Sequence, residues 1–388
     1  MRIIHFHNGA GGGVLSVIRN LLLYRQHNEI ENHVIYTINK DLVKNFQLPG
    51  LVGAASEQVF YYSPRWNFYY TCRQLSKLLP DEQAVIVAHD WLELGMVSQL
   101  GLANPVIMFL HGDYEYYYRL AIKHVTSVNA FACVASAIKK KLQQQLPART
   151  NDITYVELPV PGINAFASRK SGSRIVFIGR CEEGKGYFLL PLIDEQLRTK
   201  GHHFEWHIFG EGSDNCENQS VWGAQSNVTF YGVIPSAQML NELPRFDFLV
   251  LPTIAEGMPV TIIEAMKAGV LAIVNNLPGG VQELIGRNER GVLIEGNKID
   301  GYVKVFQKLQ LHPEEVQALT TAAMQYANII FDAARCTANI EQFLLQHSQK
   351  RSSIKKVKVY GSILDQPGIP NFIVYSTRMV LQLTKKLK

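Results

Sequence analysis

The chain has 388 residues, more than one hydrophobic core usually supports, so we expect two domains of roughly equal size. Its 47% hydrophobic and 18% charged residues are ordinary for a folded protein and exclude a disordered chain. The formal net charge of +5 is modest, and the sequence has no basic face interleaved with aromatic residues, which argues against nucleic-acid binding.

The cysteines and the apolar runs indicate in which cellular compartment the protein is expected. Five cysteines are widely scattered without a CxxC pair, which favours neither a disulfide framework nor a zinc site and fits a reducing cytosol. No uninterrupted apolar run reaches the roughly 18 residues that a membrane-spanning helix needs, and a strand and glycine turn follow the first methionine directly. We therefore expect a cytoplasmic protein without a transmembrane anchor.

The N-terminal half alternates short apolar runs with segments of helical spacing. Residues 2–6 predict a strand, residues 9–13 a glycine turn, and the apolar residues between 14 and 22 a helix. Further strands are predicted over residues 33–36, 84–88, 106–110 and 130–134. Enough chain separates them for crossover helices, which is typical of a parallel α/β sheet.

The same order recurs after a polar, linker-like stretch at residues 168–173. Strands are predicted over residues 174–178, 205–209, 228–231, 248–251 and 271–275. The predicted fold class is α/β, with two Rossmann-like doubly wound domains that face a central cleft, because such sheets bind ligands at the carboxyl ends of their strands. The expected domains are residues 1–165, residues 173–350, and a basic C-terminal tail over residues 351–388.

The C-terminal end concentrates positive charge. Its lysines and arginines include Lys350, Arg351, Lys355, Lys356, Lys358, Lys385, Lys386 and Lys388. Apolar residues recur at helical spacing between residues 371 and 388, which predicts a helix that packs back on the N-terminal domain or on a membrane. The charge suits an anionic membrane surface better than a nucleic-acid groove, and a solvated tail is the alternative.

The sequence AEGMPVTIIEAMKAG, residues 255–269, combines a helix signal with two carboxylates. Pro259 favours the first turn, an apolar stripe follows, and Gly269 stands where a helix ends. Glu256 then lies just before the helix and Glu264 about one and a half turns into it, so they do not form one acid–base pair. Each suits a different hydroxyl of a polyol ligand. The alternative is that Glu256 caps the helix and Glu264 lies on a solvated face.

Two further sets of residues in this half suit phosphate. Gly279 and Gly280 precede a helical start, where bare N–H groups and the helix dipole favour an anion, although a plain glycine turn has the same pattern. Arg180 and Lys185 follow the first strand of this half, where a guanidinium and an ammonium can bind phosphate. No Asp-x-Asp pair accompanies them, so we expect these cations to replace a metal and predict no metal site.

The N-terminal half offers fewer candidates. Gly11, Gly12 and Gly13 have neither the spacing of a dinucleotide fingerprint nor that of a P-loop, but they let the backbone approach a phosphate closely. His111 directly follows the strand at residues 106–110 and is expected to face the cleft, although a lone histidine is more often structural. The missing fingerprint argues against a dehydrogenase.

These segments together resemble the donor domain of glycosyltransferase family 4, a large retaining group with the GT-B architecture among the glycosyl transferases group 1. The resemblance covers residues 174–295 and rests on the order of FIGRCEEGKG, HIFGEG, VTFYGVIP, FLVLPTIAEGMPVTIIEAMKAGVLAIVNNLPGGVQELI and GVLI. The N-terminal half resembles the family only through its glycine loop and LHGD. Val270 departs from the pattern, because many relatives have proline after the glycine that ends the motif helix.

The resemblance implies a retaining transferase that moves a sugar from a nucleoside diphosphate sugar to a glycan or lipid-linked glycan. Arg180 and Lys185 would hold the donor diphosphate. Glu264 would bind the ribose, Glu256 the transferred sugar, and His111 the donor sugar near the reacting centre. The other donor-side positions implied are Gly12, Gly13, Phe209, Gly210, Val233, Gly257, Met258, Pro259, Gly279 and Gly280.

The resemblance also implies a setting. No cofactor is expected beyond the nucleoside diphosphate sugar, and the hexosyl transfer would serve cell-surface polysaccharide or lipopolysaccharide synthesis at the inner face of the membrane. Two other functions stay open, a non-catalytic subunit that binds a nucleotide sugar and a nucleotide-sugar epimerase on the same architecture. The sugar, the base and the acceptor depend on loops that vary freely within such a fold.

Overall fold

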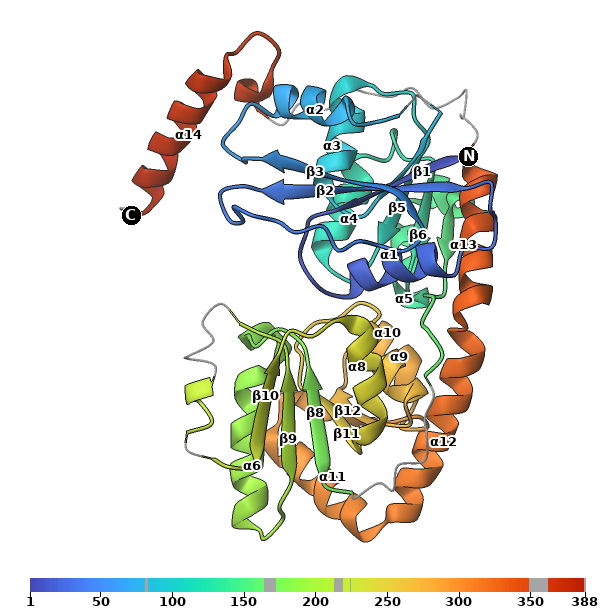
Figure 1. The fold of residues 1–388 in the computed structure, drawn as a ribbon, viewed down its shortest axis with the longest axis vertical. Coiled ribbons are helices and arrows are strands. Elements are labelled where there is room, and N and C mark those ends of the chain that lie inside the picture. The colour runs from blue at the N-terminus through green and yellow to red at the C-terminus, as the bar shows by residue number, and fades with distance from the viewer. Residues whose placement is uncertain (81–82, 164–171, 213–218, 224, 349–361, 387–388) are drawn as a thin grey trace. The chain divides into compact units, whose positions relative to one another are not determined.

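The computed structural model describes residues 1–80, 83–163, 172–212, 219–223, 225–348 and 362–386. The chain forms two compact units, which Figure 1 colours along the sequence. Unit 1 comprises residues 1–134, 138–156 and 337–388, and unit 2 comprises residues 135–137 and 157–336. The predicted linker at residues 168–173 lies mostly outside the described residues, as do Lys388 and the cationic residues between Lys350 and Lys358.

Unit 1 is built on a seven-stranded parallel sheet of order β3-β2-β1-β4-β5-β6-β7. Its strands are β1 (Arg2–His7), β2 (Glu31–Asn39), β3 (Ala54–Tyr62), β4 (Val85–Ala88), β5 (Val106–Leu110), β6 (Ala130–Cys133) and β7 (Ile153–Tyr155). The strands β4, β5 and β6 are buried along their whole length, as expected when helices cover both faces of a parallel sheet.

The helices of unit 1 lie on both sides of its sheet. They are α1 (Gly13–Leu23), α2 (Phe68–Ser76), α3 (Trp91–Leu100), α4 (Glu115–Lys123), most of α5 (Ser136–Gln145), the later part of α13 (Ala333–His347), and α14 (Asn371–Lys386), with the 3-10 turns η1 (Pro147–Asp152) and η6 (Ile363–Asp365). Figure 1 shows α1 on one side and α2 and α3 on the other. On the α1 side, Ile18 and Leu22 pack with Val34 and Tyr36 of β2.

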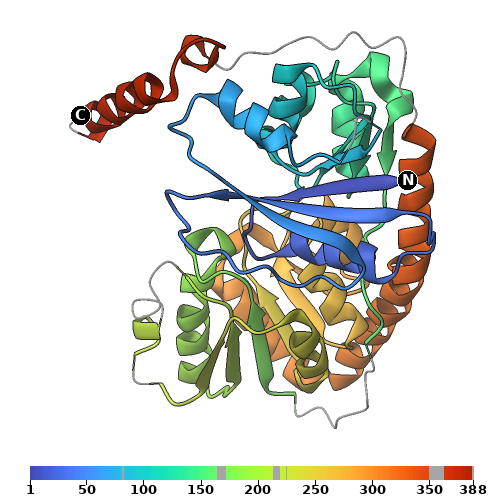
Figure 2. The same cartoon turned by 45° about the horizontal axis from the view of Figure 1, so that its top comes forward.

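Two later helices are tied to unit 1 although they follow unit 2 in the sequence. Figures 1 and 2 both show α13 passing the N-terminus, and there the carboxylate of Glu341 accepts hydrogen bonds from the backbone N–H groups of Gln26 and His27 at 3.0 and 3.2 Å. Residues 173–350 were expected to form one domain, but unit 2 ends at Cys336, because the rest of α13 packs on unit 1.

Unit 2 has a six-stranded parallel sheet of order β10-β9-β8-β11-β12-β13. Its strands are β8 (Arg174–Ile178), β9 (Glu205–Phe209), β10 (Val228–Gly232), β11 (Phe248–Leu251), β12 (Leu271–Asn275) and β13 (Val292–Ile294). Its helices are α6 (Leu190–Thr199), α8 (Ser236–Glu242), α9 (Val260–Lys267), α10 (Gly280–Ile285), α11 (Ile299–Leu311), α12 (Pro313–Ile330) and the start of α13, with the 3-10 turns η2 (Glu183–Lys185), η3 (Tyr187–Leu189), η4 (Leu243–Arg245) and η5 (Glu295–Asn297).

Each sheet has a point where the strand order reverses. In unit 1 the strands that follow β1 in the sequence are added on one side of it, and those that follow β4 are added on the opposite side. The same reversal occurs between β8 and β11 in unit 2. In doubly wound sheets, the loops after the two strands at such a point diverge to opposite faces and leave a crevice at the carboxyl ends. The loops after β1, β4, β8 and β11 are therefore where ligand-binding residues are expected.

The predicted strands are found with small shifts in their ends, and β5, β8, β9, β11 and β12 have the predicted bounds. Three strands were missed. The strand β3 lies at the edge of its sheet with an irregular, half-exposed pattern, while β7 and β13 have three residues each, too few to show a period. Among the described residues, no helix combines the length and apolar character needed to cross a bilayer.

Candidate functional site

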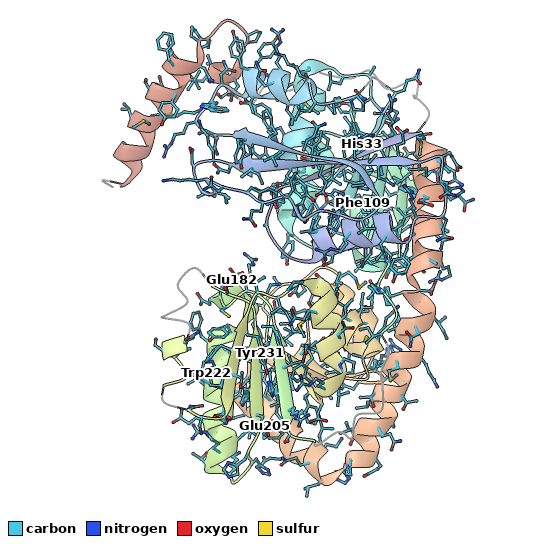
Figure 3. The ribbon with its side chains drawn as sticks, viewed as in Figure 1. His33, Phe109, Glu182, Glu205, Trp222 and Tyr231 are labelled. Carbon is cyan, nitrogen blue, oxygen red and sulfur yellow. The ribbon has the colours of Figure 1, made fainter. Side chains whose placement is uncertain are left out.

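The reversal point of unit 2 brings together the loops after β8 and β11. The first loop carries Gly179, Arg180 and Lys185, and the second carries Glu256. Figure 3 labels Glu182 in the first loop, at the carboxyl end of the sheet, far from Glu205 at the amino end of β9. The residues predicted for phosphate and sugar therefore share the end of the sheet where doubly wound folds bind ligands.

Hydrogen bonds hold these two loops together. The backbone N–H of Ile254 donates to the carbonyl of Gly184 at 3.2 Å, and the hydroxyl of Thr253 donates to the same carbonyl at 3.1 Å. The side-chain amide of Asn275, at the end of β12, donates to the carbonyl of Thr253 at 2.9 Å, and Tyr302 donates to Asn275 at 2.8 Å. The loops thus keep a fixed spacing, which reduces the ordering that a ligand must bring about.

Two glycines permit the close approach of backbone in this region. A Cβ on Gly186, whose φ is +70°, would lie 2.0 Å from the carbonyl oxygen of Pro252. A Cβ on Gly280 would lie 2.0 Å from the carbonyl oxygen of Gly257. Any larger residue at either position would push the loops apart. Glycine is therefore required where the loops after β8, β11 and β12 touch.

The central contact of this site is an ion pair between Lys185 and Glu256. The ammonium nitrogen of Lys185 lies 2.6 Å from Oε1 of Glu256, and the side chains are only 24% and 13% exposed. Glu256 does not cap α9, since the N-cap of that helix is Pro259 and it has no side-chain cap bond. An ammonium has three donors, so Lys185 can bind an anionic oxygen while it keeps Glu256.

Arg180 stands at the rim of the same site. Its guanidinium pairs with Glu182 at 2.9 Å and remains 68% exposed. Such an exposed pair contributes little to stability, so the guanidinium can turn toward a ligand phosphate at small cost. Glu264 lies partly exposed within α9, in the second turn of the motif helix.

Three further predicted positions of unit 2 lie at the carboxyl ends of β9 and β10, since Phe209 ends β9 and Gly210 and Val233 directly follow the two strands. The rings of Phe209 and Tyr231 stack with centroids 4.2 Å apart, and the N–H of Gly210 donates to the carbonyl of Gly232 at 2.8 Å. Val233 follows directly and is 71% exposed. An exposed apolar side chain beside a rigid backbone corner suits contact with the flat ring of a base.

Unit 1 places three histidines in a row at its own reversal point. Nε2 of His111 lies 2.7 Å from Nδ1 of His89, and Nε2 of His89 lies 3.4 Å from Nδ1 of His5. Each of these residues is within or directly after one of the adjacent strands β1, β4 and β5. A neutral imidazole has one N–H, so a donor in one ring requires an acceptor in the next, and the three tautomers are linked.

Burial keeps these imidazoles neutral. It lowers the pKa of His5 and of His7 to about 4 and that of His111 to about 3, and it also lowers the pKa of His89. Neighbouring histidines add to the effect, because a second positive charge nearby is unfavourable. His111 therefore acts near neutral pH as a hydrogen-bonding group without charge.

The glycine turn of unit 1 lines a small cavity of about 140 Å³. Gly12 and Gly13 lie on its wall together with His7, His89 and Asp90. Beside it, the buried carboxyl group of Glu93 accepts hydrogen bonds from the N–H groups of His89 and Asp90 at 2.7 and 2.6 Å. Burial raises the pKa of Glu93 to about 8. Among the described residues, no group of three His, Cys, Asp or Glu side chains is arranged to hold a metal ion.

The sequence indicated His111 but missed its partners. His5 and His89 are not part of any recognisable motif. The only signal in the sequence is their position, because His5 lies within β1 and His89 directly follows β4. The sequence also missed Asn275 and Tyr302, which support the Lys185 and Glu256 loops, because their spacing of 27 residues has no local meaning.

Part of the chain matches a known protein family. Residues 163–326 match the family model described as glycosyl transferases group 1. The chain is 21% identical over 314 residues to the lipopolysaccharide 1,6-galactosyltransferase of Escherichia coli K12. The aligned segment covers 76% of this chain and 85% of that protein. It is 25% identical over 240 residues to the putative teichuronic acid biosynthesis glycosyltransferase TuaC of Bacillus subtilis, over 57% of this chain and 55% of that one.

A solved structure shares the fold. The Anabaena protein HepE, in complex with UDP-glucose, superposes with a TM-score of 0.70 at 14% identity, over 89% of this chain and all of the other. The chain thus has the two-unit α/β fold of GT-B glycosyltransferases, and the matched segment of glycosyl transferases group 1 contains the whole Lys185–Glu256 site.

Proposed function

We propose that this glycosyltransferase is a retaining enzyme that transfers a hexose from a nucleoside diphosphate sugar to a glycan or lipid-linked glycan during cell-surface polysaccharide or lipopolysaccharide synthesis. The observation that carries the proposal is the partly buried Lys185–Glu256 pair at the reversal point of unit 2, inside the matched segment. The names of the relatives support the setting, since one acts on lipopolysaccharide and another is assigned to teichuronic acid.

The proposed donor contacts divide by charge. Lys185 and Arg180 bind the diphosphate, because a point charge and a planar guanidinium both favour phosphate oxygens. Glu256 accepts hydrogen bonds from hydroxyls of the transferred sugar, and Glu264 accepts them from the ribose. From unit 1, His111 is proposed to contact the transferred sugar as a neutral imidazole.

Backbone groups complete the proposed donor contacts. Gly279 and Gly280 would offer N–H groups at the start of α10, and the motif residues between Glu256 and α9 would line the sugar. The N–H groups of Gly12 and Gly13 have the same proposed use in unit 1. Phe209, Gly210 and Val233 are proposed to bound the nucleoside.

The proposed chemistry places most of the catalytic effect on the leaving group. The bond between the anomeric carbon and the β-phosphate oxygen breaks, the acceptor oxygen bonds to the anomeric carbon on the same face, and the acceptor proton passes to the departing diphosphate. Lys185 and Arg180 stabilise the charge that grows on that diphosphate, which is the term expected to lower the barrier most. No metal or other cofactor is included in this proposal.

The donor is best found by its effect on stability. A ligand at 100 times its dissociation constant raises the free energy of unfolding by about 2.7 kcal/mol. We expect one of the common nucleoside diphosphate sugars to raise the melting temperature of the wild-type chain, with UDP sugars as the first panel because HepE was solved with one. The stabilisation should be much smaller in Lys185→Ala. If no donor stabilises the protein, the proposed function is wrong.

Product analysis separates the alternatives. Transfer predicts a new glycan only when donor and acceptor are both present. If no metal takes part, the product should still form in the presence of EDTA. A nucleotide-sugar epimerase would convert the donor in the absence of any acceptor. A non-catalytic subunit would bind the donor and leave it unchanged in every mixture.

We propose a cytoplasmic location at the inner face of the membrane, where nucleotide sugars and lipid-linked glycans meet. The concentration of positive charge near the C-terminus supports this location.

A further inference from the structure

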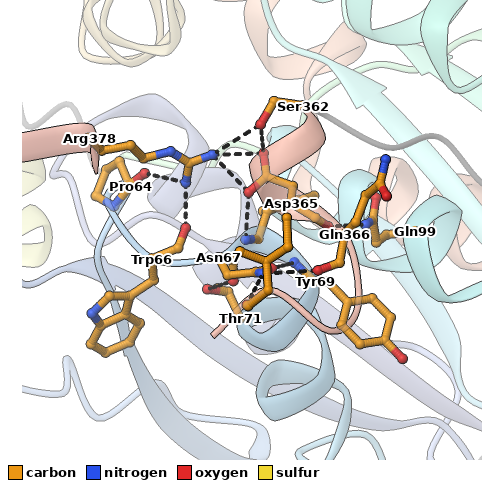
Figure 4. A network of polar contacts seen from close by, with 12 residues as sticks. Pro64, Trp66, Asn67, Tyr69, Thr71, Gln99, Ser362, Asp365, Gln366 and Arg378 are labelled. Carbon is orange, nitrogen blue, oxygen red and sulfur yellow. Dashed lines mark hydrogen bonds and ion pairs between the residues drawn. The ribbon is translucent and has the colours of Figure 1, made fainter. Parts of the chain in front are cut away.

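The helix α14 is fixed to unit 1 by a buried network of hydrogen bonds around Asp365 (Figure 4). Both carboxylate oxygens of Asp365 lie 2.8 Å from Nη2 of Arg378, in the middle of the helix. The same carboxylate accepts the N–H of Phe68 at 2.8 Å and the hydroxyl of Ser362 at 2.9 Å. We call this the Asp365–Arg378 latch. The side chains of Asp365 and Arg378 are 7% and 21% exposed, so this ion pair is better protected from solvent than a surface pair.

A second set of contacts holds the first turn of α14. The side chain of Asn371 accepts the backbone N–H of Asn67 at 2.6 Å, and the side-chain amide of Asn67 donates to the carbonyl of Ile369 at 2.9 Å. Val374, one turn before Arg378 in the helix, is fully buried. Val374 and Arg378 are four residues apart and lie on one face, so this face is the one that docks on unit 1.

The opposite face of α14 is exposed and, apart from Ser376, apolar. Phe372 and Met379 are seven residues apart, as are Ile373 and Val380, so each pair shares a face of the helix. These four side chains are 71%, 40%, 43% and 60% exposed, in that order. They form what we call the outer stripe of α14. A monomeric protein gains nothing from an exposed stripe of this kind, so it points to a binding surface.

Aromatic side chains also lie beside the start of the helix. A cavity of about 580 Å³ adjoins Pro370 and Asn371, and its wall includes Tyr61, Trp66 and Tyr70. The ammonium of Lys40 lies 4.0 Å above the ring of Trp66. Tyrosine and tryptophan beside a cation suit the headgroup level of a membrane, where one end of the ring is apolar and the other is wet.

The positive charge of the sequence is concentrated in residues 348–388, which include this helix. Residues 348–388 contain nine of the 38 lysines and arginines and one of the 33 acidic residues. The segment therefore has a net charge of +8, and the other 347 residues have a net charge of −3. No acidic residue occurs in α14, and Lys385 and Lys386 end it.

We propose that α14 is a membrane-docking helix whose outer stripe enters the interface of an anionic bilayer while the Asp365–Arg378 latch fixes its direction on unit 1. The 16-residue helix has an apolar face for the acyl boundary and lysines for anionic headgroups, the two features of an interfacial helix. A second copy of the chain fits less well, because two segments of net charge +8 repel each other. The proposal deepens the proposed location at the inner membrane face.

The test is binding of the full-length protein to vesicles. Flotation would be measured with phosphatidylcholine alone and with phosphatidylcholine and phosphatidylglycerol in a two-to-one ratio. We expect binding to the anionic vesicles and at least tenfold weaker binding to the neutral ones. The double variant Phe372→Ser/Val380→Ser should bind anionic vesicles at least tenfold more weakly than wild type. Lys385→Gln/Lys386→Gln should reduce binding several-fold and weaken its salt dependence.

A matched control removes exposed apolar side chains elsewhere. Leu311 and Ile329 of unit 2 are 76% and 68% exposed, so Leu311→Ser/Ile329→Ser makes the same chemical change away from α14 and should bind vesicles as wild type does. The proposal is overturned if the α14 variant binds as tightly as wild type or if anionic lipid makes no difference. It is also overturned if wild type is a dimer that the α14 variant dissociates while neither binds vesicles.

The two proposals fail separately. Vesicle binding needs neither donor nor acceptor, and donor-induced stabilisation needs no lipid. The α14 variant should keep the melting temperature of wild type and the same increase with the donor, which excludes misfolding as the cause of lost binding. A protein that floats with vesicles but binds no nucleotide sugar would refute the transfer and leave the membrane-docking helix standing.

Discussion

The ammonium of Lys185 lies 2.6 Å from the carboxylate of Glu256, although 71 residues separate them in the sequence. The two groups proposed to bind the diphosphate and the sugar thus hold each other in position. The pair fixes the rotamer of both side chains before any ligand arrives, which is how a preorganised site avoids ordering costs on binding.

Breaking this pair should affect catalysis far more than folding. We expect Glu256→Gln to lower kcat/KM for sugar transfer at least 100-fold, or about 2.7 kcal/mol, because the amide no longer orients Lys185 by charge. The loss of unfolding free energy should be about 1–2 kcal/mol, since the pair is only partly buried. Initial rates and urea unfolding would measure the two effects.

An exposed pair of the same kind is the control. Lys308 and Glu315 also lie 2.6 Å apart, with side chains 58% and 36% exposed. Glu315→Gln should leave kcat/KM unchanged and change the unfolding free energy by less than about 0.5 kcal/mol. Equal activity in Glu256→Gln and Glu315→Gln would contradict the assigned site.

The close approach at Gly186 gives a second prediction. Gly186→Ala combines left-handed backbone strain with a Cβ 2.0 Å from the carbonyl of Pro252, so it should separate the loops after β8 and β11. Gly201→Ala is the matched control, because Gly201 has φ of +80° with open space around it and bears only the backbone strain of about 1–2 kcal/mol. Thermal unfolding should show a larger loss for Gly186→Ala, with weakened donor binding. Equal losses in both variants would argue against the tight contact.

The buried histidines of unit 1 predict loss of stability in acid. The pKa of His5 is about 4 in the folded protein and 6.5 in the unfolded chain, so the unfolded state binds more protons between these values. Stability is full above pH 6.5 and falls as the pH drops toward 4, by about 2 kcal/mol at pH 5 for this one group. Urea unfolding of wild type and His5→Phe from pH 8 to pH 4.5 would measure the slope.

His5→Phe should flatten that slope, because a titrating group is removed. At pH 8 neither state of the wild-type protein protonates His5, so any stability difference there reports the changed packing and the lost hydrogen bond to His89, not titration, and serves as the internal control. An unchanged slope in the variant would mean that His5 does not contribute to the acid sensitivity.

The latch gives a prediction that needs no membrane. Asp365→Asn removes the charge that the guanidinium of Arg378 contacts through both carboxylate oxygens, so α14 should open more often. We expect hydrogen exchange of α14 amides to become roughly tenfold faster or more, while the sheet of unit 1 is unaffected. Arg378→Lys should give an intermediate rate, since lysine keeps the charge but loses the planar fork. Unchanged exchange in Asp365→Asn would show that other contacts hold the helix.

Local pattern was enough to predict much of the fold. The motif helix was expected to follow Glu256 and to stop at Gly269, and α9 runs from Val260 to Lys267 with Gly269 at φ +68°. Pro259 proved to be the N-cap, one position before the predicted first turn. Such features depend on neighbours within a few residues, so propensity and spacing decide them.

The sequence by itself determined which polar residues follow which strands, because apolar runs, glycine turns and helix stops are encoded locally. Only the tertiary structure decided their partners. Lys185 meets Glu256, His111 meets His89, and Asp365 meets Arg378 because folding makes neighbours of strand ends and helices that are distant along the chain. The order of strands in each sheet sets those neighbours, and no spacing within the sequence records that order.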